Sequence, residues 1–168
     1  MIKLIQKLIQ KLIQKLRRFQ SDLRYWKAKK YLVGTVLDVG AEYDHCSFGT
    51  QCDINPKFEG CEKQDAQHLT YKDDEFDTVV CLETLEHCFS PVSVMEELKR
   101  VARKRVIISI PREPHFSIVR FGFWNKEHFW GVTPYILNAV FGEPICSSSF
   151  FFRWYFAVWD MRLKVMEK

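Results

Sequence analysis

Hydrophobic residues recur with the period of an α-helix over residues 2–16 and then give way to short apolar runs. The unit Lys-Leu-Ile-Gln occurs three times in succession from Lys3, which brings back a Leu-Ile pair every four residues. This spacing predicts one amphipathic helix with its lysines along one flank. Because four residues exceed the 3.6-residue turn, the apolar stripe winds by about 40° with each repeat.

Short apolar runs after Tyr31 predict buried β-strands, most of them ended by glycine, proline or asparagine. The predicted strands are 35–40, 51–54, 60–63, 76–82 and 106–110. One helix is predicted to begin at Pro91 with Ser90 as its N-cap, and another to run from Pro134 to about Phe141. Two runs with no helix between them, 145–152 and 154–162, predict a closing antiparallel hairpin.

This alternation of strands with helical or loop crossovers predicts an α/β fold. We expect a doubly wound, mostly parallel sheet with the hairpin at its C-terminal edge. A chain of 168 residues is long enough to bury the core of one such domain. The predicted organisation is therefore an amphipathic helix appendage over residues 1–30 and one α/β domain over residues 31–168.

Charge is divided unevenly along the chain. The net charge is +4, but six of the 25 basic residues lie within residues 1–20 and all 21 acidic residues lie after them, so the remainder carries −2. A slightly acidic body argues against a broad nucleic-acid footprint. We therefore expect no nucleic-acid partner.

The six cysteines show neither a CxxC pair nor zinc-finger spacing, and we interpret them as reduced thiols of a cytoplasmic protein. No run of about 18 apolar residues occurs, so no membrane span is predicted. The lysines at every fourth position also make the N-terminal segment unlike a signal peptide. Three roles stay open for residues 1–18: peripheral binding to an anionic membrane surface, packing in a homodimer or onto another partner, and capping of the chain's own domain.

Several short motifs follow one another in a fixed order. They are Asp65-Ala66-Gln67-His68-Leu69, the segment 73–80 with its acidic start and Phe-Asp-Thr-Val-Val end, Leu85-Glu86-His87, and Glu-Leu-Lys-Arg-Val at 97–101. In this combination they resemble the methyltransferase type 11 branch of the class I S-adenosylmethionine-dependent methyltransferases, over roughly residues 34–163. The resemblance implies a Rossmann-like fold, S-adenosylmethionine as cofactor and methyl transfer as the activity.

Ligands of a doubly wound sheet bind beyond the carboxyl ends of its strands. Four candidate cofactor-binding residues stand at predicted strand ends: Asp38, Gly40, Asp53 and Leu82. The resemblance implies that Asp53 accepts hydrogen bonds from the ribose hydroxyls, that Asp65 contacts the adenine amino group, and that Ala66 and Leu69 line the base. The residues alone leave a turn-forming role open for both aspartates.

The loop after the first strand departs from the family pattern. Where the family has a glycine-rich loop, Gly40 is followed here by Ala41, Glu42 and Tyr43. Only about ten residues separate the first two strands, which is near the minimum for a parallel crossover. Glu42 would also repel the cofactor carboxylate unless it turned away.

The segment after the fourth strand carries a candidate catalytic and metal-binding group. Glu83, Glu86 and His87 stand at i, i+3 and i+4, so one helical turn would place them on one face. Two carboxylates and an imidazole suit Mg²⁺, Mn²⁺ or Zn²⁺. The pattern is similar to that of metal-dependent small-RNA and ubiquinone-pathway O-methyltransferases, in which His128 would occupy the position of a further ligand. Without a metal, His87 is the candidate general base, with Glu83 beside it as a second catalytic candidate.

The sequence favours two functions, and a third, nucleic-acid methylation, rests only on the pattern of Glu83, Glu86 and His87 and is disfavoured by the slightly acidic body. The first is O- or N-methylation of a small-molecule or lipid-linked acceptor, with the aromatic stretch 121–130 either covering the acceptor or filling the core. The second is a degenerate methyltransferase fold that binds a partner without catalysis, which the altered loop favours. The acceptor itself is not encoded in any motif of the chain.

Overall fold

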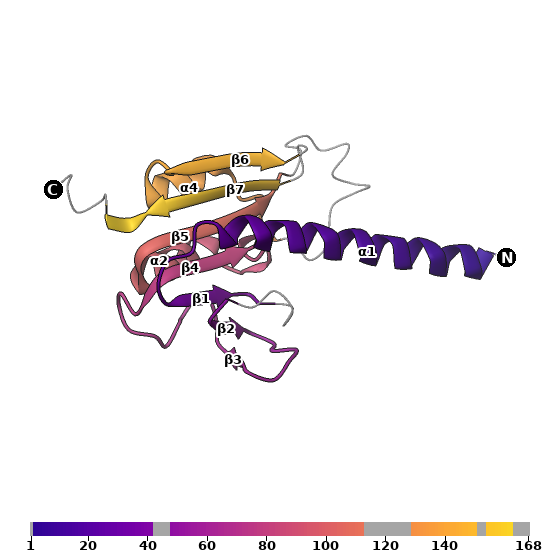
Figure 1. Cartoon of the computed structure of the whole chain (residues 1–168), viewed down its shortest axis with the longest axis horizontal. Helices are drawn as coiled ribbons and strands as arrows, with labels where there is room; N and C mark the ends of the chain where they lie inside the picture. The colour runs from indigo at the N-terminus through magenta and orange to yellow at the C-terminus, as the bar shows by residue number, and fades with distance from the viewer. Residues whose placement is uncertain (1, 42–47, 113–128, 151–153, 163–168) are drawn as a thin grey trace.

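The computed structural model describes residues 2–41, 48–112, 129–150 and 154–162 (Figure 1). The helices are α1 (Ile2–Lys29), α2 (Pro91–Val101) and α4 (Pro134–Phe141), with a 3-10 turn, η2, at Leu85–His87. The strands are β1 (Val36–Val39), β2 (Thr50–Asp53), β3 (Cys61–Lys63), β4 (Phe76–Leu82), β5 (Ala102–Pro111), β6 (Cys146–Phe150) and β7 (Trp154–Asp160).

One sheet contains all seven of these strands in the order β3-β2-β1-β4-β5-β7-β6. Every neighbouring pair from β3 to β5 is parallel, whereas β7 runs antiparallel to both β5 and β6. The predicted α/β fold, with a mostly parallel sheet and a C-terminal antiparallel hairpin, is confirmed. Because β1 lies between β2 and β4, the strand order reverses there, and the edge beside β1 is where ligands of such sheets bind.

The two faces of the sheet bury different halves of each strand, as the two-residue period of a strand requires. Val79 and Cys81 of β4 face the core shared with α2 and α4, whose buried residues include Leu98 and Leu137. Val80, by contrast, belongs to the core on the α1 side. Full burial of each aliphatic side chain of this size stabilises the fold by about 1.5–3 kcal/mol.

The predicted helix starts are confirmed. The side chain of Ser90 accepts a hydrogen bond from the backbone N–H of Ser93, and that of Thr133 accepts one from Ile136. Each cap is followed by a proline in the first helical turn, where the missing N–H has no intrahelical partner to lose. The connections after β2 and β3 contain no helix, so the loops of that half of the sheet border directly on its carboxyl edge.

Helix α1 differs along its length. Tyr25 and Ala28 are buried against the sheet, and the ammonium group of Lys27 lies 4.8 Å from the centre of the Phe156 ring and donates a hydrogen bond to Ser148. The earlier turns extend beyond the sheet into solvent (Figure 1). The last turns of α1 thus share the core of the sheet, and the domain boundary at residue 30 stays a prediction. No helix in the described ranges is long and apolar enough to cross a membrane.

Candidate functional site

A cleft of about 650 Å³ opens at the carboxyl edge of the sheet, around the ends of β1, β2 and β4. This volume is within the usual range for small-molecule sites. Its walls are formed by Val39, Gly40, Cys52, Asp53, Ile54, Asn55, Lys57, Gln64, Asp65, Ala66, Gln67, Glu83, Thr84, His87, Cys88, Phe89 and Phe129. Residues predicted from separate segments therefore meet in one place.

Gly40 ends β1 in a conformation that glycine favours, with φ of 79°. A β-carbon at this position would lie 2.2 Å from Oγ1 of Thr84, closer than any real contact. The backbone N–H groups of Gly40 and Ala41 both donate to the carbonyl of Cys52, at 2.8 and 3.1 Å, which ties the loop to β2. The chain thus needs a glycine here to bring the backbone of β1 close to β4. Glu42 and Tyr43 lie outside the described residues.

Asp53 lies at the carboxyl end of β2 and lines the cleft. Its Oδ1 accepts a hydrogen bond of 2.7 Å from the backbone N–H of Asn55, so the side chain does form the turn that its sequence suggests. This hydrogen bond uses only one of the two carboxylate oxygens, so the turn-forming role does not exclude a ligand contact by Asp53.

Asp65 and Ala66 also line the cleft, in the loop between β3 and β4. Oδ1 of Asp65 accepts hydrogen bonds from the backbone N–H of Gln67 at 2.9 Å and from its side-chain amide at 3.3 Å. The backbone hydrogen bond from Gln67 is the main reason that the pKa of Asp65 lies below its usual value. Asp65 is therefore ionised at neutral pH and is positioned to accept a hydrogen bond from a ligand.

Arg100 of α2 holds this loop in place. Its guanidinium donates to the carbonyls of Tyr71 and Leu69 at 2.7 and 2.9 Å, and it pairs with Glu97 at 2.7 Å. Glu97 in turn accepts a 2.8 Å hydrogen bond from the backbone N–H of Leu69. These bonds help hold Leu69 in the core next to α2, and its side chain is not among the cleft-lining residues.

Glu83 lies directly after β4 with φ of 53°, an unusual conformation for a residue other than glycine. Its backbone N–H donates to the carbonyl of Ser109 at 3.0 Å, and its Oε1 accepts a 3.0 Å hydrogen bond from the hydroxyl of the same serine. Nη1 of Arg24 in α1 lies 4.0 Å from Oε2 of Glu83. The carboxylate is thus held by β5 and α1 while it borders the cleft.

The other two members of the predicted group lie in η2. His87 lines the cleft, with 38% of its side chain exposed, whereas Glu86 is buried with 1% exposed and does not line it. The prediction of one helical turn through all three residues is wrong, because the turn begins only at Leu85 and Glu83 has left-handed backbone. No group of three His, Cys, Asp or Glu side chains in the described segments is arranged to hold a metal ion. His128 lies outside those segments.

Asp38 and Leu82, two further predicted cofactor-binding residues, are buried rather than among the cleft-lining residues. Leu82 packs on the α1 side of the sheet. Burial raises the pKa of Asp38 to about 8, and the nearby hydroxyl of Tyr25 offsets this only in part. Neither carboxylate oxygen of Asp38 has a hydrogen-bond partner of normal geometry among the described residues. Asp38 is therefore a buried and largely neutral acid at neutral pH.

Several cleft residues were not predicted. Thr84 donates to the carbonyl of Leu82 at 3.2 Å and fills the space left by Gly40. Burial raises the pKa of Cys88 to about 11 and that of Cys52 to about 12, so both thiols stay protonated at neutral pH. Thr84 lies within the predicted Glu83–His87 group and Cys88 directly follows it, so their positions after β4 were the available signal.

Residues 29–110 match the family model described as a methyltransferase domain. Solved S-adenosylmethionine-dependent methyltransferases share the fold of the chain and align with it over most of its length. The chain has the class I methyltransferase fold. The resemblance predicted from the motifs of residues 65–101 is confirmed.

Three solved methyltransferases illustrate the likeness. Magnesium protoporphyrin IX methyltransferase of Synechocystis, solved with bound S-adenosylhomocysteine, is 17% identical, with 85% of this chain and 81% of that chain covered and a TM-score of 0.60. A SAM-dependent methyltransferase of Aquifex aeolicus is 14% identical, with 82% and 89% covered and a TM-score of 0.58. A possible histamine N-methyltransferase of Thermotoga maritima is 15% identical, with 83% and 88% covered and a TM-score of 0.61. No curated protein sequence matches the chain significantly.

Proposed function

We propose that the chain binds S-adenosylmethionine in the cleft at the carboxyl edge of the sheet and transfers its methyl group to a small-molecule or lipid-linked acceptor. The observation that carries the proposal is the convergence of Gly40, Asp53 and Asp65 on one cleft where the strand order reverses. The match of residues 29–110 to a methyltransferase domain supports the same chemistry.

The residues present fit this cofactor in chemical type. Asp53 and Asp65 offer carboxylate oxygens to a ribose and an adenine amino group, and Ala66 offers an apolar contact to the base. Glu83 places a further negative charge on the cleft wall, which favours a cationic sulfonium group. Lys57 also lines the cleft, and its positive charge suits the carboxylate of the cofactor's methionine moiety.

The bound cofactor would supply a methyl group made electrophilic by its sulfonium sulfur. The chain's contribution is to hold the acceptor oxygen or nitrogen in line with that methyl while the methyl–sulfur bond breaks and the new bond forms. His87 lines the cleft and would accept the acceptor proton on its imidazole, whose Nε2 lies 3.9 Å from Oε1 of Glu86. A carboxylate at that distance stabilises the imidazolium that results.

A second candidate function is partner binding by the same fold without catalysis. The observation in its favour is the sequence after Gly40, in which Ala41 is already buried with 1% of its surface exposed and only nonglycine residues follow to Cys46. Affinity for the cofactor separates the two functions, because a partner-binding module that lost catalysis together with its glycine loop does not need to bind S-adenosylmethionine.

Calorimetric titration with S-adenosylmethionine tests the proposal. Wild-type protein should bind, and Asp53→Ala should weaken binding by about 10- to 100-fold, the usual worth of hydrogen bonds to a charged group. Glu59→Ala is the matched control, because Glu59 is an exposed carboxylate close to Asp53 in sequence that does not line the cleft. Equal affinities of wild type and Asp53→Ala would contradict the assigned site, and no binding by wild type would favour the partner-binding function.

A further inference from the structure

The exposed part of α1 carries an apolar stripe on a defined side of the helix. At 100° per residue, Ile5, Leu8, Ile9 and Leu12 fall within an arc of about 100°. Their exposed fractions lie between 49% and 59%. Phe19 and Trp26 fall within the same arc and are 62% and 58% exposed. The stripe thus continues from the projecting turns onto the part of α1 that is packed on the sheet.

Most of the stripe faces away from the chain's own core. The residues that α1 buries most deeply against the sheet are Ser21, Tyr25 and Ala28. On the same helical projection they lie about 180° from the middle of the stripe. Leu23 falls within the arc of the stripe and is partly buried against the same core, so the stripe touches the body at that position. Of the three roles open for the N-terminal helix, capping of its own domain would require the apolar residues to point inward. The helix instead makes most of that contact with its opposite side. It leaves six apolar residues of the stripe exposed: Ile5, Leu8, Ile9, Leu12, Phe19 and Trp26.

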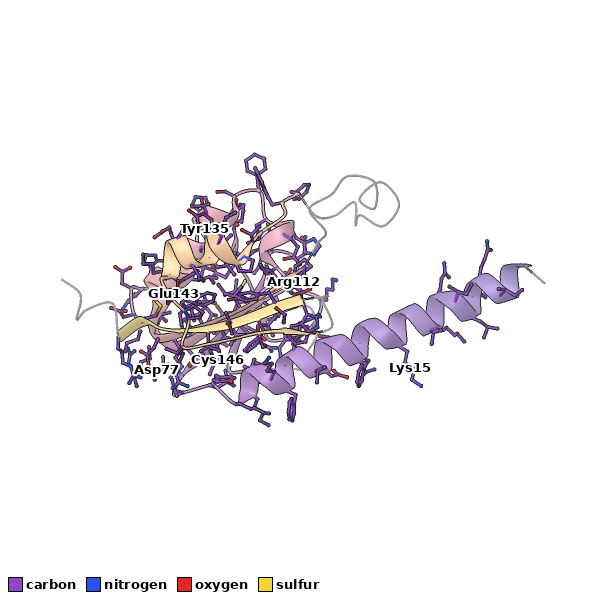
Figure 2. All side chains as sticks on the ribbon, turned by 90° about the horizontal axis from the view of Figure 1, so that it is seen from above. Lys15, Asp77, Arg112, Tyr135, Glu143 and Cys146 are labelled. Carbon is purple, nitrogen blue, oxygen red and sulfur yellow. The ribbon has the colours of Figure 1, made fainter. Side chains whose placement is uncertain are left out.

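Positive charge accompanies the stripe. Lys7, Lys11, Lys15 and Arg18 fall in an adjoining arc of about 80°, and no acidic residue precedes Asp22. These four side chains are exposed. Figure 2 shows Lys15 on the part of α1 that projects away from the sheet. A surface that accepts the stripe therefore meets a row of cations as well.

We propose that α1 binds an anionic lipid bilayer, with its stripe among the acyl chains and its basic flank at the headgroups. Charge complementarity selects this occupant over a second copy of the chain, because paired α1 helices would bring two uncompensated basic segments together. The four-residue repeat also departs from the seven-residue repeat that keeps two coiled helices in contact. A flat lipid surface needs only a broad apolar face beside basic residues.

The proposed membrane contact lies on the side of the molecule where the cleft opens. The parallel strands point toward the projecting half of α1, which extends past their carboxyl ends (Figure 1). In addition, Arg24 of α1 lies 4.0 Å from Glu83 in the cleft wall. A bilayer bound by α1 would present a lipid-linked acceptor at the edge of the sheet that holds the cleft. This part of the inference rests on the proposed function.

The test is sedimentation of the full chain with phosphatidylcholine vesicles. One set of vesicles also contains phosphatidylserine, at about 30 mol%, and the other set contains none. Binding should require phosphatidylserine. Lys7→Gln with Lys11→Gln should weaken it about 30-fold, since each basic residue near an anionic surface is worth roughly a factor of five. Leu8→Glu with Leu12→Glu makes the same change of net charge and also removes two apolar contacts with the bilayer. This pair should therefore weaken vesicle binding by at least about 100-fold.

Gln6→Glu with Gln10→Glu is the matched control, because it makes the same change of net charge on the polar side of α1. It should retain more binding than the leucine pair, and an equal loss in both pairs would overturn insertion of the stripe. Binding that survives Leu8→Glu with Leu12→Glu would do the same. A dimer in vesicle-free light scattering that the leucine pair dissociates would assign the stripe to a second copy. Vesicle binding is measured without cofactor, and cofactor affinity without vesicles, so either proposal can fail alone.

Discussion

Replacement of Asp38 by asparagine should remove a pH dependence from the stability of the fold. Asp38 is 1% exposed, and burial raises its pKa to about 8. In the unfolded chain an aspartate titrates near its ordinary value of about 3.9. Between these two values the folded state holds one proton more than the unfolded state, so the stability of the wild type must fall as pH rises.

The expected slope is about 1.4 kcal/mol for each pH unit, or roughly 2.7 kcal/mol between pH 5 and pH 7. The stabilised carboxylates do not mask it. Asp65, Asp77, Glu97 and Asp160 have lowered pKa values, so the stability that they contribute is lost only as pH falls through the acidic range. Asparagine keeps the shape of Asp38 without its titration, and its stability should lack this slope.

Urea denaturation followed by tryptophan fluorescence at pH 5, 6, 7 and 8 measures the effect. Asp74→Asn serves as the control, because it makes the same chemical change at an exposed side chain. Asp38→Asn should be less stable relative to wild type at pH 5 than at pH 8, and Asp74→Asn should follow the wild type. Parallel curves for wild type and Asp38→Asn would refute the reasoning, since they would mean that Asp38 is already ionised in the folded protein at pH 5.

Other predictions concern the cleft and its supports. Gly40→Ala should lower the free energy of unfolding in urea by about 1–3 kcal/mol, because alanine is strained at positive φ and its β-carbon would collide with Thr84. Arg100→Met should cost about 2–4 kcal/mol in the same assay, because it leaves Glu97 and two loop carbonyls without their donor; a loss below about 0.5 kcal/mol would show that the loop does not depend on it. Alkylation of Cys88 by iodoacetamide at pH 8, followed by mass spectrometry, should be about 100-fold slower than that of an ordinary thiol, because burial raises its pKa to about 11; an ordinary rate would contradict that pKa.

The sequence predicted the strands that are buried on both faces better than those that reach the surface. Strand β4 has the bounds expected from its apolar run, 76–82, because every residue in it is buried. Strand β5 begins at Ala102, four residues before the expected start. The first part of β5 carries basic side chains, so the apolar run that predicted this strand does not include it. Arg105 is accommodated there because its guanidinium donates a hydrogen bond to the carbonyl of Tyr31 at 2.7 Å.

Positions at strand ends were predictable in the site, whereas contacts across the sheet were not. Gly40 and Asp53 line the cleft because the carboxyl ends of parallel strands share one edge, and the sequence shows where β1 and β2 end. The inward position of Leu69 depends in part on Glu97, which follows 28 residues later, and no local pattern reports that contact. The direction in which the stripe of α1 faces likewise emerged only once Tyr25 was located against the sheet.

The central claim is that this cleft is the cofactor site. A crystal structure of the protein, from crystals grown with millimolar S-adenosylhomocysteine, would test it most directly. We predict density for the ligand across the end of β1, with its ribose at Asp53 and its adenine between Asp65 and Ala66. Density at another place, or a cleft without ligand in crystals of a protein that binds the cofactor in solution, would contradict the account.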